Sequence, residues 1–258
     1  MAAEEAHTEK NSWFLLRRAG TEGRPVLFVS GPPTSGAIFQ RVQERLAPRR
    51  SIAIEGLANA ESFDAAAFSR EFKALCEAEN VGAVVVHGLA LPLVLQSDLA
   101  AVELLVLSNG PLRRLDPFTR ALSRVPCTVM EKLVLQPRVF NKWLASSVGL
   151  RRAVVNPYVM ERDVVEGLTA PFLESSVARK QTNRWLKALP KQLPVTLPVD
   201  TKVVAIWGDK DFLYPVEEVE QYQDLEVINI PGGRFLHPQE RPWELADACR
   251  EMFEKLGV

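Results

Sequence analysis

Short apolar runs alternate with helical patterns along most of this 258-residue chain, and this alternation constrains the fold more than any other feature. The runs are rich in β-branched and aliphatic residues, which is typical of strands buried on both faces of a sheet. Helices between such strands indicate parallel strands joined by right-handed crossovers. We therefore predict an α/β fold with a mostly parallel sheet flanked by helices, and strands at residues 25–29, 51–54, 81–86, 104–107, 202–207 and 225–230.

Helical periodicity fills the segments between these runs. Phe68, Phe72 and Leu75 recur at helical spacing, and Asp64 precedes them as a candidate N-cap. The same reasoning predicts a first strand at residues 13–16 and helices at 37–46, 64–79, 89–99, 216–222 and 242–256.

The pattern changes between residues 112 and 198. Strand signal disappears there, and short amphipathic helical stretches are separated by eight prolines from Pro117 to Pro198. We expect a helical cap at residues 112–198, inserted into a core made of residues 12–111 and 199–258. The polar residues 1–11 are expected to form a flexible tail.

Composition excludes several classes of function. A net charge of −1 and a pI near 6.4 give no reason to expect nucleic-acid binding. Three widely spaced cysteines (Cys76, Cys127 and Cys249) indicate a reducing compartment and no disulfide framework. The N-terminus has no apolar leader, and the apolar stretches are too short and irregular for a membrane span. We expect a cytoplasmic protein without a cofactor or metal, and leave a homodimer open.

Four loop segments stand at the ends of the predicted strands. They read Ser30-Gly31-Pro32-Pro33, Val-Val-Val-His-Gly-Leu-Ala-Leu-Pro at 84–92, Gly-Asp-Lys-Asp-Phe-Leu-Tyr-Pro at 208–215, and Gly-Arg-Phe-Leu-His-Pro-Gln-Glu-Arg-Pro at 233–242. In order and spacing these segments resemble the α/β-hydrolase family. The resemblance is strongest to the branch with a helical cap, such as epoxide hydrolases and haloalkane dehalogenases. It implies an α/β-hydrolase fold with a nucleophile after the strand at 81–86, an acid at Asp211 and a histidine near residue 234.

The chain departs from that family at the residues that carry its chemistry. If Gly88 is the first glycine of the Gly-x-Ser-x-Gly turn, the nucleophile position falls on Ala90, and a shift of one residue places it on Leu89. Neither side chain is a nucleophile. We expect this turn to be relaxed, because Pro92 replaces the second glycine. Arg234 stands where the family has its histidine, and an ion pair with Asp211 is expected, either structural or as an anchor for an anionic ligand.

Two functions from different classes follow. The first is a catalytically deficient hydrolase-like protein that binds a small apolar or anionic ligand, or a protein partner. The second is a non-hydrolytic enzyme, such as a lyase, isomerase or cyclase, with Asp211 as acid or base. Hydrolysis through Ser30, Ser35 or Cys127 is a third hypothesis. The expected ligand-binding residues are Ser30, Pro32, His87, Leu89, Ala90, Trp143, Asp211 and Arg234.

The histidines and the aromatic residues of the insertion have simpler interpretations. His87 ends a core strand, so a buried structural role is expected, with a base role as the alternative. His237 is expected on a loop surface, unless the loop shifts and this residue replaces the missing histidine. Aromatic side chains of the insertion are expected to pack the cap, and some of them to line a cavity above the sheet: Phe118, Phe140, Trp143, Tyr158, Phe172 and Trp185.

Overall fold

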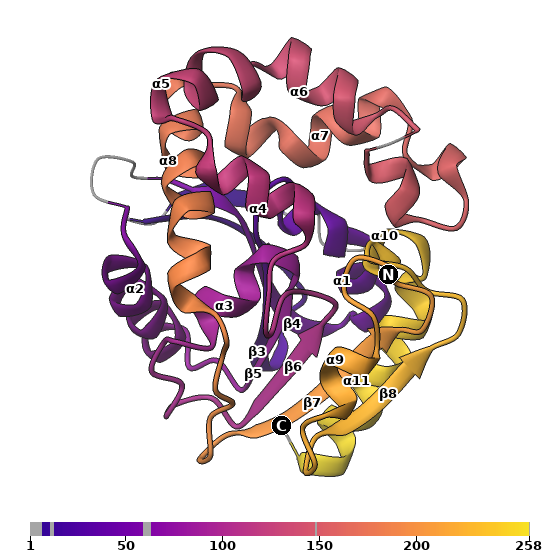
Figure 1. Ribbon diagram of the computed structural model, residues 1–258. Coiled ribbons are helices and arrows are strands. Elements are labelled where there is room, and N and C mark those ends of the chain that lie inside the picture. Colours follow the sequence, from indigo (N-terminus) through magenta and orange to yellow (C-terminus); the bar gives the residue numbers. More distant parts are fainter. Residues whose placement is uncertain (1–6, 11–12, 59–62, 148, 258) are drawn as a thin grey trace.

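The computed structural model describes residues 7–10, 13–58, 63–147 and 149–257 (Figure 1). Its centre is an eight-stranded sheet in the order β1-β2-β4-β3-β5-β6-β7-β8. Strands β3 to β8 are parallel to one another, and β1 and β2 run antiparallel at one edge. The predicted mostly parallel sheet is therefore confirmed, with strands β1 (His7–Lys10), β2 (Phe14–Ala19), β3 (Glu22–Ser30), β4 (Arg49–Leu57), β5 (Ala83–His87), β6 (Leu104–Ser108), β7 (Lys202–Gly208) and β8 (Glu226–Ile230).

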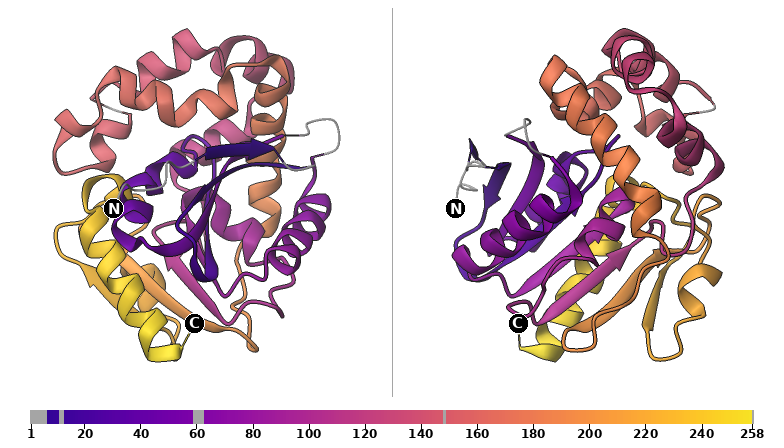
Figure 2. Two further views of the ribbon diagram at one scale, coloured as in Figure 1. Left: turned by 180° about the vertical axis from the view of Figure 1, so that it is seen from behind. Right: turned by 60° about the vertical axis from the view of Figure 1, so that its left-hand side comes forward.

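The central strands are buried on both faces, as their sequences predict. Every residue of β5 and β6 is buried. Helices cover the two faces, α2 and α3 on one side and α1 with α11 on the other (Figures 1 and 2). Their bounds are α1 (Gln40–Leu46), α2 (Ala65–Ala78), α3 (Leu91–Val94) and α11 (Pro242–Leu256), joined by the single-turn elements η1 (Gly36–Phe39), η2 (Gly88–Ala90), α9 (Glu217–Glu220) and α10 (His237–Glu240).

Two of the predicted helices illustrate how local chemistry decides a boundary. The Asp64 side chain accepts a hydrogen bond from the Ala67 amide at 2.7 Å, which confirms this residue as the N-cap of α2. The helix predicted at 89–99 is wrong in length, because α3 ends at Val94. Beyond it, the Ser97 hydroxyl donates to the Leu93 carbonyl and the Asp98 carboxylate accepts from the Ala100 amide. Such local bonds compete with the helix.

The expected N-terminal tail is partly structured. Residues 7–10 form β1, which pairs with β2 in antiparallel register from His7 opposite Arg18 to Lys10 opposite Leu15. The prediction of a flexible tail is wrong for these four residues, because their backbone completes the edge of the sheet. Residues 1–6 and 11, which the same prediction covers, lie outside the described residues.

The chain between β6 and β7 is helical and contains no strand among its described residues. Figure 2 shows these helices as a layer across one end of the sheet. The limits drawn at 112 and 198 stay a prediction. The elements are α4 (Pro117–Arg124), α5 (Cys127–Val129), η3 (Met130–Val134), α6 (Pro137–Leu144), η4 (Leu150–Ala153), η5 (Pro157–Val159), α7 (Arg162–Leu173), α8 (Ser176–Ala188) and η6 (Leu189–Gln192).

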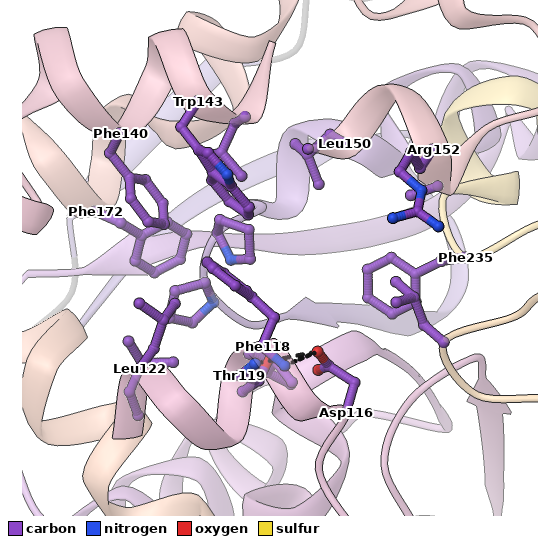
Figure 3. A pocket seen from close by; sticks show the side chains of 18 of the residues that line it. Asp116, Phe118, Thr119, Leu122, Phe140, Trp143, Leu150, Arg152, Phe172 and Phe235 are labelled. Carbon is purple, nitrogen blue, oxygen red and sulfur yellow. Dashed lines mark hydrogen bonds between the residues drawn. The ribbon is translucent and has the colours of Figure 1, made fainter. Parts of the chain in front are cut away.

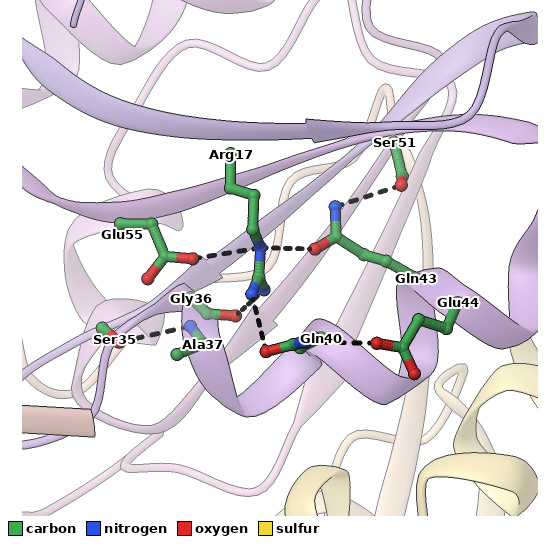
Figure 4. Close-up of polar contacts among 9 residues, drawn as sticks. All are labelled: Arg17, Ser35, Gly36, Ala37, Gln40, Gln43, Glu44, Ser51 and Glu55. Carbon is green, nitrogen blue, oxygen red and sulfur yellow. Dashed lines mark hydrogen bonds and ion pairs between the residues drawn. The ribbon is translucent and has the colours of Figure 1, made fainter. Parts of the chain in front are cut away.

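A buried arginine on the antiparallel strand β2 forms hydrogen bonds and an ion pair with neighbouring elements (Figure 4). On β2, Arg17 donates to Gln43 Oε1 at 3.1 Å and to the Gly36 carbonyl at 3.0 Å, and its Nε lies 3.1 Å from Glu55 Oε1. Burial lowers the pKa of Arg17 and raises the pKa of Glu55. A buried charge is tolerated only when it is paired and hydrogen-bonded, so this network stabilises one arrangement of β2, β4 and α1.

In the part of the chain that the structure describes, no helix is long and apolar enough to cross a membrane.

Candidate active site and the cavity under the cap

The parallel strands bring the four sequence segments to one edge of the sheet. Ser30 lies opposite His87, and His87 lies opposite Ser108. Gly208 ends β7 beside Ile230 of β8. Because the carboxyl ends of parallel strands meet at one edge, the loops after β3, β5, β6, β7 and β8 surround a single site.

The turn after β5 has its positive-φ residue at Gly88. Gly88 has φ +62°, whereas His87 before it is extended and Ala90 after it has a helical φ of −79°. In the Gly-x-Ser-x-Gly turn it is the nucleophile that sits at the sharp, strained point between strand and helix. Gly88, and not Ala90 or Leu89, therefore occupies the sharp point of this turn. The turn keeps its positive φ at this point, and glycine adopts such a φ without steric penalty.

Phe235 packs directly on this turn. A Cβ atom on Gly88 would lie 3.1 Å from Phe235 Cζ. The Phe235 ring is buried, 4.9 Å from the His87 ring and 5.7 Å from the Tyr214 ring between centroids. The side chain that faces the turn from the loop after β8 is therefore a phenyl ring.

Arg234, one residue earlier, points elsewhere. Its Nη1 donates to the carbonyls of Arg152 and Val154, at 3.2 and 3.0 Å. The Asp211 carboxylate instead accepts hydrogen bonds from Asn109 Nδ2 at 2.7 Å and from the Leu213 amide at 2.9 Å. The predicted ion pair between Arg234 and Asp211 is thus wrong, because each group is directed to partners on other segments.

Burial dominates the electrostatics of Asp211. The loss of solvation raises the pKa of this carboxyl to about 7, and the hydrogen bonds from Leu213 and Asn109 only partly oppose that shift. Asn109 also accepts the Gly208 amide through Oδ1 at 2.7 Å, and its backbone carbonyl accepts the Gly88 amide at 2.8 Å. This asparagine joins the loops after β5, β6 and β7. Its sequence context, Ser-Asn-Gly-Pro, signals only a turn.

Two buried histidines share one serine beneath the site. The Arg234 carbonyl lies 3.2 Å from His237 Nδ1, so this nitrogen carries the proton and Nε2 accepts from the Ser108 hydroxyl at 3.2 Å. Ser108 Oγ in turn accepts from His87 Nδ1 at 3.0 Å. His87 Nε2 is then a buried acceptor without a partner among the described residues.

This cluster corrects the prediction for His237, which is fully buried instead of lying on a loop surface. Its loop folds into the single-turn helix α10 under the sheet edge. Burial lowers the pKa of His237 to about 4 and holds the pKa of His87 well below its ordinary value. Both rings are therefore neutral near pH 7, and the buried position expected for His87 is confirmed.

A cavity of about 330 Å³ separates the cap from the sheet edge (Figure 3). Its size falls in the range of small-molecule sites, and most of its walls are apolar or aromatic. The sheet side contributes Pro32, Pro33, Leu89, Phe212, Leu213, Tyr214 and Phe235. The cap contributes Phe118, Leu122, Phe140, Trp143, Leu144, Leu150, Phe172, Leu173 and Leu186, among others.

The predicted ligand-binding residues divide into two groups around this cavity. Pro32, Leu89 and Trp143 line it. The other five do not: Ser30, His87, Ala90, Asp211 and Arg234.

Four of the six cap aromatics lie along the cavity. Tyr158 is instead 80% exposed, and Trp185 donates through Nε1 to the Leu89 carbonyl at 3.0 Å.

Two charged side chains line the cavity, and sequence reasoning missed both. Asp116 caps α4, since its Oδ1 accepts the amides of Phe118 and Thr119, and its Oδ2 accepts the Tyr214 hydroxyl at 2.9 Å. Arg152 lies on η4, with its guanidinium carbon 5.0 Å from the centroid of the Phe212 ring. Within the described residues, no group of three or more histidine, cysteine or acidic side chains is arranged to hold a metal ion.

Comparison with known proteins identifies the fold. The sequence matches no family model and no curated protein. Among solved structures, it is similar to an α/β-hydrolase fold protein from Burkholderia ambifaria, with 19% identity over 96% of this chain and 100% of that one and a TM-score of 0.75. The haloalkane dehalogenase DbeA from Bradyrhizobium elkani USDA94 is 17% identical over 98% of each chain, with a TM-score of 0.73.

The Cif epoxide hydrolase from Acinetobacter nosocomialis is 15% identical over 96% of this chain and 88% of that one, with a TM-score of 0.72. All three identities are low, so the likeness extends to architecture alone. The expectation drawn from the four loop segments is confirmed at that level. This chain has the α/β-hydrolase fold.

Proposed function

We propose that this chain is a non-hydrolytic member of its fold class that binds a small apolar ligand in the cavity between sheet and cap. The observation that carries the proposal is the pair Gly88 and Phe235. The sharp turn after β5 presents no side chain, and a phenyl ring packs on it.

Hydrolysis of an ester needs a nucleophile and a base within hydrogen-bonding reach of each other. Gly88 supplies no nucleophilic atom, and Phe235 has no proton to donate and no lone pair to accept one. Epoxide and haloalkane hydrolysis place a carboxylate at the same turn, which glycine also lacks. Among described residues, the side chains lining the cavity include no serine or cysteine; of the other hydroxyl and carboxyl groups there, Thr182 donates to the Phe172 carbonyl at 2.9 Å and Asp116 accepts three hydrogen bonds.

The remaining nucleophile candidates are engaged or distant. Ser30 Oγ lies 2.7 Å from Thr34 Oγ1. The Ser108 hydroxyl is fully buried between His87 and His237 and does not line the cavity. Cys127 is exposed on α5. Ser35 Oγ accepts the Ala37 amide at 3.2 Å and does not line the cavity. These contacts argue against hydrolysis through any of these four side chains.

The cavity supports binding of a small molecule better than docking of a protein. Its walls are apolar, and burying ligand surface against them stabilises a complex by about 25 cal/mol per Å² before the losses of association. An acid–base role for Asp211 lacks comparable support, because this carboxyl is 4% exposed, both of its oxygens accept hydrogen bonds, and it does not line the cavity.

A neutral fluorescent probe tests the proposal. N-phenyl-1-naphthylamine should bind the wild-type protein at one site, with a rise in probe fluorescence, and the protein should not hydrolyse p-nitrophenyl butyrate. Leu122→Trp fills the cavity from α4 and should weaken probe binding at least about tenfold. Leu133→Trp makes the same change at a cap leucine that is 63% exposed and outside the cavity, and should leave probe binding unchanged. Equal affinities of the two variants, or ester turnover by the wild type, would contradict the proposal.

A further inference from the structure

We infer that the ligand of this cavity is an apolar acid, with an aromatic or aliphatic body among the cap side chains and a carboxylate that pairs with Arg152. This inference rests on the proposed function and adds the charge of the ligand. It depends on an asymmetry between the two ends of the cavity.

One end is built from aromatic rings. The rings of Phe118 and Trp143 stack with centroids 4.2 Å apart and an interplanar angle of 17°. Phe140 lies 5.8 Å from Trp143, and Phe172 completes this wall (Figure 3). Flat, rigid surfaces of this kind favour a flat or hydrocarbon group and offer few hydrogen bonds to a polar one.

The other end carries Arg152, which Figure 3 shows beside Phe235 and away from Phe140 and Phe172. Its guanidinium carbon lies 5.0 Å from the centroid of the Phe212 ring, its side chain is exposed, and no ion pair or side-chain hydrogen bond joins it to another described residue. Its N–H groups are therefore available to a ligand. A planar fork of donors of this kind matches the two oxygens of a carboxylate.

The nearby acidic groups are already engaged. The Asp116 carboxylate accepts three hydrogen bonds, two from the first turn of α4 and one from Tyr214. Glu240 accepts the amides of Val155 and Asn156 through its two oxygens. Arg234 adds a second guanidinium next to this segment, bound to the Arg152 and Val154 carbonyls. The oxygens of these acids are therefore occupied by neutral donors, and the charged group left to pair with a ligand at this end of the cavity is the Arg152 guanidinium.

A cation is the opposite alternative, since aromatic walls and one carboxylate can also attract a positive group. The structure favours the anion. The N-terminus of α4 and the Tyr214 hydroxyl already face the Asp116 charge, whereas Arg152 has no acidic partner among the described residues. An anion gains a charge-assisted pair with a guanidinium that has no acidic partner, whereas a cation would have to share a carboxylate whose oxygens already accept hydrogen bonds from the protein.

Three probes with one body separate these cases by calorimetric titration at pH 7.5. They are the anion of 1-naphthaleneacetic acid (the acetate), the neutral 1-naphthaleneacetamide (the amide) and the cationic 1-naphthylmethylamine. The wild type should bind the acetate at least about tenfold more tightly than the amide, as a charge-assisted pair predicts. Arg152→Met keeps an apolar stem against Phe212 and should reduce the acetate-to-amide ratio to about one. The matched control Arg151→Met should keep the ratio of the wild type.

The outcomes are distinguishable. If the amide binds as tightly as the acetate, or if Arg152→Met leaves their ratio unchanged, the acidic ligand is refuted while the apolar cavity site stands. Tightest binding of 1-naphthylmethylamine would refute it in favour of a cation. If none of the probes binds, the proposed function fails together with this inference.

Discussion

The buried His237 makes a quantitative prediction about acid stability. Replacing it with glutamine removes the titrating ring and keeps one donor and one acceptor near Ser108 and the Arg234 carbonyl. The wild type should lose stability relative to His237→Gln as the pH falls. The sign follows from burial: the folded protein holds this ring neutral, whereas the unfolded chain takes up a proton once the pH drops below 6.5.

The magnitude follows from the two pKa values. The pKa of His237 falls from 6.5 in the unfolded chain to about 4 in the folded protein. Each pH unit between these values corresponds to about 1.4 kcal/mol, so the wild type should lose about 3 kcal/mol relative to the variant between pH 6.5 and 4. Asp211 works in the opposite direction, because its raised pKa of about 7 favours the folded state as the pH falls, but this contribution is common to both proteins.

Urea unfolding followed by tryptophan fluorescence at pH 7.5, 6.5, 5.5 and 4.5 measures the difference directly. The m-values of the two proteins should agree, which shows that both unfold in one comparable step. The difference in unfolding free energy should be constant above pH 6.5 and should shift toward the variant below it. Parallel profiles over the whole range would show that His237 keeps an ordinary pKa and is not buried as described.

Four other substitutions, one of them a control, test the packing around the site and at the edge of the sheet. Gly31→Ala should destabilise the fold by about 1–3 kcal/mol in thermal unfolding, because the added Cβ would lie 2.7 Å from backbone atoms of the turn after β5. The control Gly167→Ala adds its Cβ in open space on α7 and should be neutral or stabilising by up to about 1 kcal/mol. Arg17→Met should cost about 3–5 kcal/mol in urea unfolding, since it leaves a buried carboxylate without its cation, and a loss under 1 kcal/mol would contradict the network. Gly88→Ser should be destabilised by about 1–3 kcal/mol, because of the positive φ at this position and the contact of the new side chain with Phe235. The variant should gain no esterase activity on p-nitrophenyl butyrate. Turnover by this single variant would show that a base is present.

The sheet could be predicted from sequence because its signal is local and repeated. Each central strand is a run of β-branched residues such as Val84-Val85-Val86, and burial on both faces leaves no other periodicity for it to follow. The final helix has its predicted bounds, 242–256; Pro242 stands in its first turn, and Gly257, with φ +70°, ends it.

The site could not be predicted to the same accuracy, because each of its residues depends on distant segments. A glycine in the sequence does not reveal whether it occupies the first position or the strained position of a turn. The backbone dihedral, which no local pattern specifies, puts Gly88 and not Ala90 at the sharp point of the turn. Likewise, Arg234 and Phe235 are adjacent, and the loop after β8 decides which one faces the turn. Arg152 and Asp116 line the cavity only because the cap packs over the sheet edge, and no local sequence pattern predicts this contact.

The most direct test of the central claim is native mass spectrometry of the wild-type protein equilibrated with 2-naphthyl butyrate, followed by a denaturing spectrum of the same sample. Binding without hydrolysis predicts a complex with one intact ester, which is lost completely on denaturation, and no naphthol above the rate in buffer. A butyryl group that remains attached to the denatured protein, or release of naphthol that scales with protein concentration, would contradict it.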